Sequence, residues 1–169
     1  MDQAEQYIKD ETNGFKPVRE GDYTNSNVVL AGTTVVLENT TAIRVYFKTK
    51  DGSALDEVMV DNTVLLLNGG YTYVDGFTIR YFSTGSEKTP YCIEISGIYA
   101  KDIGHIFDYD FGDWSFTYSV MGYAYSILNS TSSSEAAKTT VKALALYGYE
   151  ANAYFTATCT YSYDEEGDV

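Results

Sequence analysis

Apolar and polar positions alternate along most of the chain between residues 27 and 119. In the segment AIRVYFK, residues 42–48, the strongly apolar side chains recur with the period of a strand that has one face on a core and the other in water. Similar short runs, rich in β-branched residues, are bounded by turn signals such as Asp51-Gly52 and Asp75-Gly76. The pattern predicts about seven short strands, and therefore an antiparallel sandwich or barrel.

The period changes to about 3.6 residues from Ser119 onward, which predicts two helices. Val120 and Ala124 belong to the apolar stripe of the first helix, which ends in the polar segment NSTSS. Ser132 lies three residues before Glu135, the spacing of a capping box that begins the second helix. The apolar stripe of the second helix consists of Ala137, Val141, Leu144, Tyr147, Ala151 and Tyr154. Because both stripes need a partner, we expect a helical hairpin that packs on the sheet.

The predicted fold class is therefore mainly β: an antiparallel β-sandwich-like domain with a C-terminal two-helix hairpin packed on it, an α+β architecture. Residues 1–26 are polar and carry several turn formers, so we expect a linker or lead-in that contains one short helix at residues 3–10. The domain itself is predicted to span residues 27–156. The acidic segment at residues 157–169 is expected to be a disordered tail.

Charge and hydropathy narrow the choice of partners. The chain has 11 Lys and Arg against 24 Asp and Glu, a formal net charge of -13, which disfavours the phosphate neutralisation that nucleic-acid binding needs. The densest cations, Arg44, Lys48 and Lys50, alternate with apolar residues and indicate a solvated strand face. No run of 18 apolar residues is present to span a membrane. We therefore expect neither nucleic acid nor membrane as a partner.

The sequence leaves two alternatives for the cellular location of the protein. Seventeen tyrosines beside one tryptophan, one histidine and two cysteines form a mixture that suits extracellular β-rich modules. The first residues show no charged segment followed by an apolar run, so the chain is either cytoplasmic or a piece of a longer exported protein whose signal lies upstream. Cys92 and Cys159 permit one disulfide, but Cys92 also fits a small buried core position.

Several segments resemble a module that recurs in large secreted and cell-surface proteins of anaerobic Gram-positive gut bacteria. The resemblance covers about residues 30–156 and includes the strand NTTAIRVYFK. Its other matching positions are Ile98, Ala100, Asp102 and Ile103, then Thr117, Tyr118 and Ser119, then Val141 to Leu146 with Tyr147, Ala151, Tyr154 and Phe155. The chain departs from the pattern in a longer strand region, GSALDEVMVDNTVLLLNGGYTYVDGF. The resemblance implies an exported multidomain protein, with neighbouring domains as partners, and brings no catalytic motif with it.

No nucleophile constellation stands out, so we expect no enzyme. His105 is the only histidine, and no Ser lies in a G-x-S-x-G context, so a surface or capping role is favoured. Asp108 and Asp110 share a strand face and could serve glycoside hydrolysis only if a cleft held them at a defined distance. The segment DYDFGD also brings Asp108, Asp110 and Asp113 together as the best candidate calcium ligands, although an ordinary hairpin turn explains it better. No other cofactor is expected.

Sugar binding is the function that the sequence favours. Carbohydrate-binding modules are typically β-sandwiches that offer exposed aromatic rings to sugar faces, and the candidate rings are Trp114, Tyr71, Tyr73 and Tyr109. The same rings could instead fill the core with their hydroxyls at its edge. We therefore expect a noncatalytic, extracellular binding or accessory module of a bacterial surface protein that engages a polysaccharide or glycan. The alternative is a structural spacer or protein-docking module without a soluble ligand.

Overall fold

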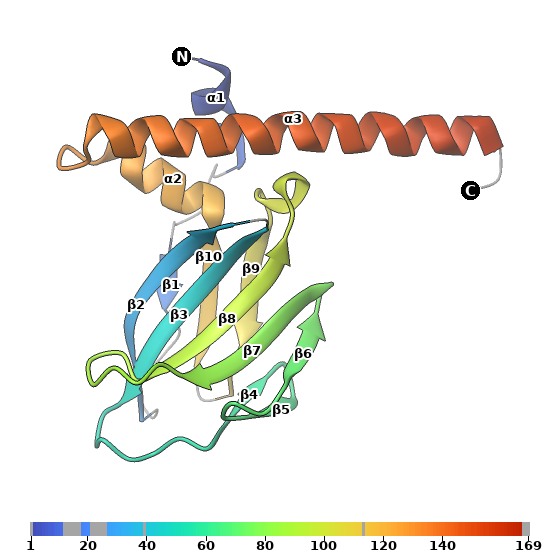
Figure 1. The fold of residues 1–169 in the computed structure, drawn as a ribbon. Coiled ribbons are helices and arrows are strands. Elements are labelled where there is room, and N and C mark those ends of the chain that lie inside the picture. The colour runs from blue at the N-terminus through green and yellow to red at the C-terminus, as the bar shows by residue number, and fades with distance from the viewer. Residues whose placement is uncertain (1, 12–17, 21–26, 39, 113, 167–169) are drawn as a thin grey trace. The chain divides into compact units, whose positions relative to one another are not determined.

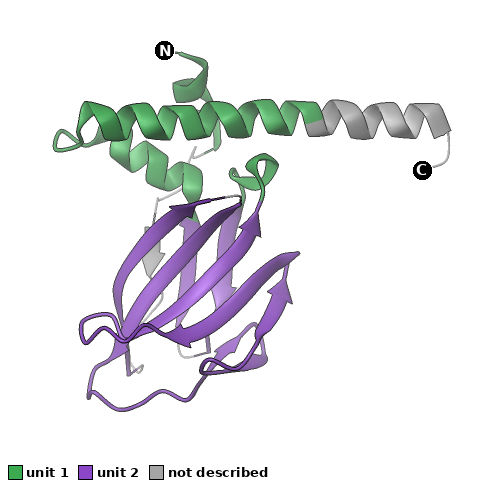
Figure 2. Ribbon diagram, in the orientation of Figure 1, with its two compact units in different colours: residues 1–17, 99–105, 119–169 green, residues 18–98, 106–118 purple. Residues whose placement is uncertain are grey.

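The computed structural model describes residues 2–11, 18–20, 27–38, 40–112 and 114–166, with the backbone alone at residues 18–20 and 155–166. The chain forms two compact units (Figure 2). The helical unit comprises residues 1–17, 99–105 and 119–169, and the sheet unit comprises residues 18–98 and 106–118. The helical unit is therefore assembled from three segments that are far apart in the sequence, and one of them interrupts the sheet unit.

The sheet unit contains all the strands that the described residues form (Figure 1). The strands are β1 (Val18–Glu20), β2 (Val28–Leu37), β3 (Thr41–Thr49), β4 (Glu57–Val60), β5 (Thr63–Leu66), β6 (Tyr71–Val74), β7 (Phe77–Ser83), β8 (Tyr91–Ile98), β9 (Ile106–Asp110) and β10 (Ser115–Ser119). Within the described ranges they make a five-stranded sheet in the order β2-β3-β8-β7-β6, a three-stranded sheet β1-β10-β9 and the hairpin β4-β5. The pairs β1-β10, β2-β3, β3-β8, β4-β5, β6-β7 and β7-β8 are all antiparallel.

The core of this unit lies between the five-stranded and the three-stranded sheet. Phe47 on β3 contacts Trp114 beside β10 with ring centroids 5.6 Å apart, and Phe77 on β7 contacts Phe107 on β9 at 5.0 Å. Tyr81, also in this core, is fully buried and donates a hydrogen bond to the Leu55 carbonyl. Large apolar rings from both sheets thus meet in one layer, which is the arrangement of a sandwich.

Turn chemistry fixes how the strands connect. Asp75 and Gly76, between β6 and β7, both have positive φ, as a tight hairpin turn of the primed type requires. Asp61 and Asn62, between β4 and β5, also both have positive φ. The Asp75-Gly76 hairpin is as predicted. The hairpin predicted within DYDFGD agrees with β9 and β10, which flank this segment and are neighbours in the three-stranded sheet, although Asp113 itself lies outside the described residues.

The helical unit consists of α1 (Gln3–Glu11), the 3-10 turn η1 (Ala100–Asp102), α2 (Val120–Asn129) and α3 (Glu135–Glu166), labelled in Figure 1 except for η1. Ser119 begins α2, because its hydroxyl accepts a hydrogen bond from the Gly122 amide at 3.1 Å. Ser134 does the same for α3 through the Ala137 amide at 3.0 Å. The predicted cap at Ser132 is therefore wrong by two positions.

Helix α3 packs with small residues toward its neighbours. Val141 and Ala145 are buried, and Gly148 lies so close to η1 that an added Cβ would overlap the Ile103 side chain and lie 3.1 Å from the Ala100 carbonyl oxygen. Tyr147 and Tyr154, predicted on the buried stripe, are instead exposed. The buried stripe was therefore placed correctly at Val141 but wrongly at the two tyrosines, because close contact with η1 demands small side chains.

The predicted fold class is confirmed: the protein is mainly β, antiparallel, and carries C-terminal helices in an α+β fold. The organisation along the chain differs from the prediction at both ends. The short helix predicted at residues 3–10 is present as α1, but it contacts α3 and belongs to the helical unit instead of a linker. The helix α3 continues to Glu166, where a tail was expected from residue 157, and residues 167–169 lie outside the described residues. Packing of the helices on the sheet stays a prediction.

The contact between Gly148 and Ile103 yields a stability prediction. Gly148→Ala should lower the free energy of unfolding by about 1–3 kcal/mol, because overpacking outweighs the roughly 1 kcal/mol that alanine contributes to a helix relative to glycine. Chemical denaturation monitored by far-ultraviolet circular dichroism measures the change. In an Ile103→Ala background the same Gly148→Ala substitution should become neutral or stabilising. Equal destabilisation in both backgrounds would contradict this contact.

Candidate functional site

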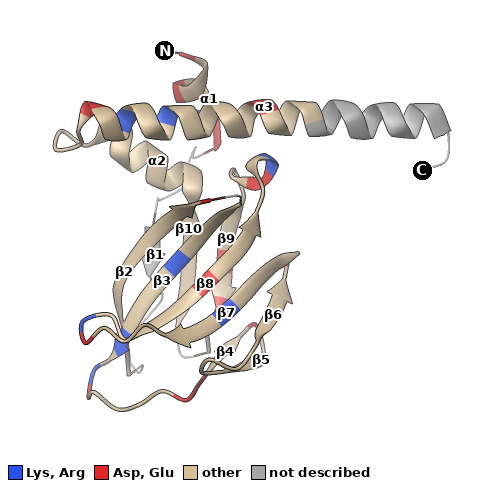
Figure 3. Cartoon of the chain, in the orientation of Figure 1, with Lys and Arg blue, Asp and Glu red and all other residues tan. Residues whose placement is uncertain are grey.

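The outer face of the five-stranded sheet, opposite the aromatic core, carries an ordered set of polar and aromatic side chains. Strand pairing places Arg44 beside Glu94, Glu94 beside Arg80, and Arg80 beside Tyr71. These four residues form a row across β3, β8, β7 and β6, which we call the arginine row. Figure 3 shows its charges on the neighbouring strands β3, β8 and β7. The row has one face because Arg44, Arg80 and Glu94 alternate with buried apolar neighbours on their own strands, and Tyr71 is paired directly with Arg80.

Glu94 is the centre of the arginine row. Its residue is only 6% exposed, and its two carboxylate oxygens accept hydrogen bonds from different arginines: Oε2 from Arg44 Nε at 2.8 Å and Oε1 from Arg80 Nη2 at 2.5 Å. Burial raises the pKa of Glu94, but hydrogen bonds and charges from Arg80 and Arg44 outweigh that effect and leave the pKa below its ordinary value. Both arginines remain partly exposed, with side-chain exposures of 36% for Arg44 and 49% for Arg80.

Tyr71 and Tyr73 lie at one end of the outer face, on the edge strand β6. They are 58% and 65% exposed, and their ring centroids lie 5.4 Å apart with the ring planes at 82°. A side-chain hydrogen bond with Tyr71 raises the pKa of Tyr73. The two predicted site residues are thus together and accessible, but the rings stand perpendicular and do not form a flat platform.

A second row next to the arginine row is apolar. Tyr46, Cys92 and Phe82 lie side by side on β3, β8 and β7, and the Arg80 guanidinium carbon is 5.3 Å from the Phe82 ring centroid. Cys92 is a free, buried thiol whose pKa is raised to about 12, chiefly by burial. A thiol in this state packs as a small apolar group. The side chain of Cys159 is not described.

The structure corrects the expectation that Trp114 and Tyr109 offer exposed rings. Trp114 is 4% exposed and packs between Phe47 and Phe111, and Tyr109 is 1% exposed with its hydroxyl donating to the Val74 carbonyl at 3.4 Å. Burial raises the pKa of Tyr109. Both rings belong to the core between the sheets, so they are not positioned to stack on a sugar.

Asp108 and Asp110 lie on the exposed face of β9 as predicted, at a shallow hollow that also includes Asp61. Their carboxylates take part in local hydrogen bonds: Asp108 accepts from the Thr117 hydroxyl at 2.9 Å, and Asp110 accepts from the Gly112 amide at 2.9 Å. The Asp61 carboxylate in turn accepts from the Asp110 amide at 3.0 Å. This acidic cluster therefore fastens the β4-β5 hairpin to β9.

The calcium prediction involved Asp108, Asp110 and Asp113, and Asp113 lies outside the described residues. Among the residues that the structure does describe, no group of three or more His, Cys, Asp or Glu side chains is placed to hold a metal ion. His105 is exposed at the end of the turn after η1, where its amide donates to the Asp102 carbonyl at 2.9 Å.

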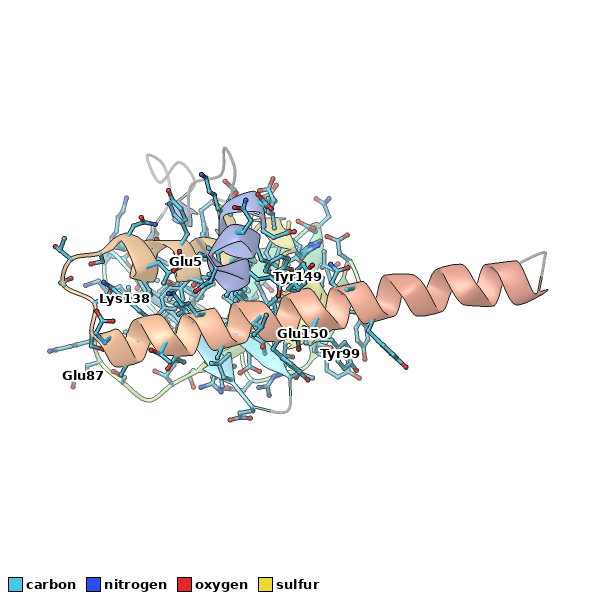
Figure 4. The ribbon with its side chains drawn as sticks, turned by 90° about the horizontal axis from the view of Figure 1, so that it is seen from above. Glu5, Glu87, Tyr99, Lys138, Tyr149 and Glu150 are labelled. Carbon is cyan, nitrogen blue, oxygen red and sulfur yellow. The ribbon has the colours of Figure 1, made fainter. Side chains whose placement is uncertain are left out.

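The helical unit has a groove between α1, α2 and α3, bordered by Glu5 and Lys138, which Figure 4 labels. Two of its three lysines, Lys138 and Lys142, lie beside carboxylates. Lys142 bonds Glu5 at 2.6 Å and Asp2 at 3.3 Å, and Lys138 lies 3.9 Å from Glu135. The ion pairs of Lys142 therefore hold α1 against α3, and the groove serves helix packing more than the binding of a charged ligand.

Comparison with known proteins adds no relative. No protein-family model, curated protein or solved structure matches the chain. In the described part of the chain, no helix has the length and apolar character needed to cross a membrane.

Sequence reasoning found Tyr71 and Tyr73 but missed the arginine row. Arg44 was interpreted as part of a solvated strand face, and Arg80 and Glu94 were not singled out. A signal was present, because the segments IRY at residues 79–81 and IEI at residues 93–95 each place a charge between two large apolar residues. Opposite charges at such positions on strands that pair side by side indicate a cross-strand ion pair.

Glu94 provides a test of the arginine row. Glu94→Gln should lower the free energy of unfolding by about 1–3 kcal/mol at pH 7, because it removes a buried charge-assisted acceptor. A carboxyl whose folded pKa is depressed stabilises above its unfolded value and loses that contribution as the pH falls through the folded pKa. The difference in the free energy of unfolding between wild type and variant should therefore shrink as the pH falls below 4.5, the ordinary pKa of the group.

Urea denaturation at pH 7, pH 4.5 and pH 3 measures this difference. Glu87→Gln, at an exposed loop position, is the matched control and should have little effect at any pH. A pH-independent loss in Glu94→Gln would contradict the assigned charge interaction.

Proposed function

We propose that the chain is a noncatalytic binding module of an extracellular bacterial surface protein and engages a polysaccharide or glycan through the outer face of its five-stranded sheet. The observation that carries this proposal is the exposed Tyr71 and Tyr73 pair beside the arginine row. Tyrosine suits such a site, since its ring offers apolar area at a low cost in side-chain entropy while its hydroxyl stays solvated.

The perpendicular ring geometry favours a particular shape of glycan. A flat crystalline polysaccharide needs coplanar rings, whereas the planes of Tyr71 and Tyr73 meet at 82°. One sugar ring can stack on one tyrosine while the other tyrosine contacts it at the side. We therefore expect single, flexible glycan chains to bind in preference to crystalline surfaces.

The noncatalytic assignment is supported by how the carboxylates nearby are used. Both oxygens of Glu94 already accept hydrogen bonds from arginines, and a carboxylate held in this way is a poor general acid. Asp108 and Asp110 are exposed on β9 and bonded to neighbouring groups of the fold. A binding role therefore fits these side chains better than hydrolysis.

A protein-docking or spacer role is the second candidate. Tyr147 and Tyr154 on α3 are 64% and 75% exposed and lie seven residues apart, which places them on one side of the helix. Exposed tyrosines in a row are typical of surfaces that meet another protein, such as a neighbouring domain of the same parent chain. This candidate involves the helical unit and leaves the arginine row without a role.

Substitution of the tyrosine pair tests the glycan proposal. The double variant Tyr71→Thr/Tyr73→Thr keeps residues suited to a strand but removes both rings, and should weaken glycan binding at least about tenfold. The double variant Tyr71→Phe/Tyr73→Phe keeps the rings and should retain most of the affinity. Retention on a panel of soluble glycans, followed by calorimetric titration, measures both.

Tyr147→Thr is the matched control, since this tyrosine is as exposed as Tyr73 but belongs to the helical unit. Glycan binding that depends on Tyr147 and is indifferent to Tyr71 and Tyr73 would contradict the proposed site. Absence of binding by a folded wild-type sample across the whole panel would favour the docking role.

A further inference from the structure

We infer that the glycan recognised on the outer face is acidic, and that Arg80, beside Tyr71, selects it by pairing with a carboxylate or sulfate group. This inference rests on the proposed function and adds the chemical class of the ligand.

On the strands of this face the charged hydrogen-bond donors outnumber the charged acceptors. Arginine and lysine side chains only donate, and Arg44, Arg80 and Lys48 all lie on this face. The acidic group among them, Glu94, is buried and already accepts from both arginines. A ligand that complements this surface supplies acceptors, and anionic groups are the strongest acceptors for guanidinium.

The net charge of the outer face also favours an anionic ligand. On the strands of the five-stranded sheet the outer face carries Arg44, Lys48 and Arg80 against Glu94, a net charge of +2, in a chain whose formal charge is -13. The rest of the chain therefore carries -15, the difference between those two values. At physiological ionic strength the Debye length is about 8 Å, so distant carboxylates are screened while contacts at the face are retained. The outer face is therefore a positive surface on a negative chain, which favours an acidic group there.

Arg80 is held in place before any ligand arrives. Glu94 accepts from its Nη2, and the Phe82 ring lies beneath its guanidinium at 5.3 Å. In the described part of the chain, no further hydrogen bond of Arg80 is recorded beyond that to Glu94, and about half of the side chain is exposed. A guanidinium fixed on one side presents its remaining donors with little loss of conformational entropy on binding.

The distance between the Tyr71 ring and the Arg80 guanidinium matches the size of one sugar unit. Tyr71 and Arg80 are directly paired across β6 and β7, and such partners have Cβ atoms roughly 4.5–5.5 Å apart. A sugar ring stacked on Tyr71 therefore brings a substituent at its edge within reach of Arg80. A carboxylate or sulfate at that position would accept hydrogen bonds from the exposed donors.

Two matched pairs of polymers test this inference. Polygalacturonate and its methyl ester differ in carboxylate charge, and dextran sulfate and dextran differ in sulfate. Affinity electrophoresis and calorimetric titration of the full chain at 0.15 M NaCl should show at least tenfold tighter binding to one acidic polymer than to its neutral partner. The pair that shows the preference distinguishes a carboxylate ligand from a sulfate ligand.

Variants of Arg80 connect the preference to the residue. Arg80→Gln should reduce the preference to less than threefold, and Arg80→Lys should restore part of it because the charge returns without the planar fork. Lys88→Gln is the matched control: it removes one positive charge from the exposed loop between β7 and β8 and should leave the preference unchanged. If Arg80→Gln does not fold, as judged by circular dichroism, Arg80→Lys and Lys48→Gln provide the same comparison, and each should lower the preference.

The outcomes separate this inference from the proposed function. Equal binding to both members of each pair, with loss in the Tyr71→Thr/Tyr73→Thr variant, would retain the glycan site and overturn the acidic preference. Equal losses in Arg80→Gln and Lys88→Gln would mean general charge attraction and would also overturn it. No binding to any of the four polymers or to the panel of soluble glycans would overturn the proposed function together with the inference.

Discussion

The sharing of one buried carboxylate by two arginines is the constraint on which the sheet depends. Glu94 is buried on the middle strand of three, with Arg44 on one neighbour and Arg80 on the other. A buried carboxylate without partners is costly, so the folded state needs both neighbours in register. A slip of one residue in either strand would turn an arginine toward the aromatic core and an apolar side chain outward. The ion pairs therefore act on specificity of pairing as well as on stability.

That register and the β6-β7 hairpin together decide what the outer face presents. Arg80 is opposite Glu94 on one side, and the hairpin turn at Asp75-Gly76 places Tyr71 opposite Arg80 on the other, with Tyr73 two positions along the edge strand. Ile79 and Tyr81, on either side of Arg80, are turned into the core by the same alternation. Core and candidate site are thus two faces of one pairing pattern, and a change in the strand pairing would alter both.

The sequence was sufficient for the helices and for most of the strands, but it missed β1 at Val18–Glu20, which falls in the predicted linker, and it was insufficient for the burial of particular rings. Alternation and the Asp75-Gly76 turn predicted the strands, and the change of period after Ser119 predicted α2 and α3. Trp114 was misjudged because alternation gives the two faces of a strand but not which of them meets a second sheet. Tyr147 was misjudged because the buried side of α3 is set by close contact at Gly148, and such a contact is not visible in hydrophobicity.

The abundance of tyrosine has two physical explanations in one chain. Tyr81 and Tyr109 are buried, and each ring fills the core while its hydroxyl reaches a backbone carbonyl at the edge. Tyr71 and Tyr73 use the same amphipathic side chain in the opposite way, with both rings exposed and packed edge to face against each other. Composition cannot separate these uses, because both need an apolar ring with a polar end. Position relative to the arginine row separates them, since only the exposed pair lies where a ring and a guanidinium can contact the same ligand.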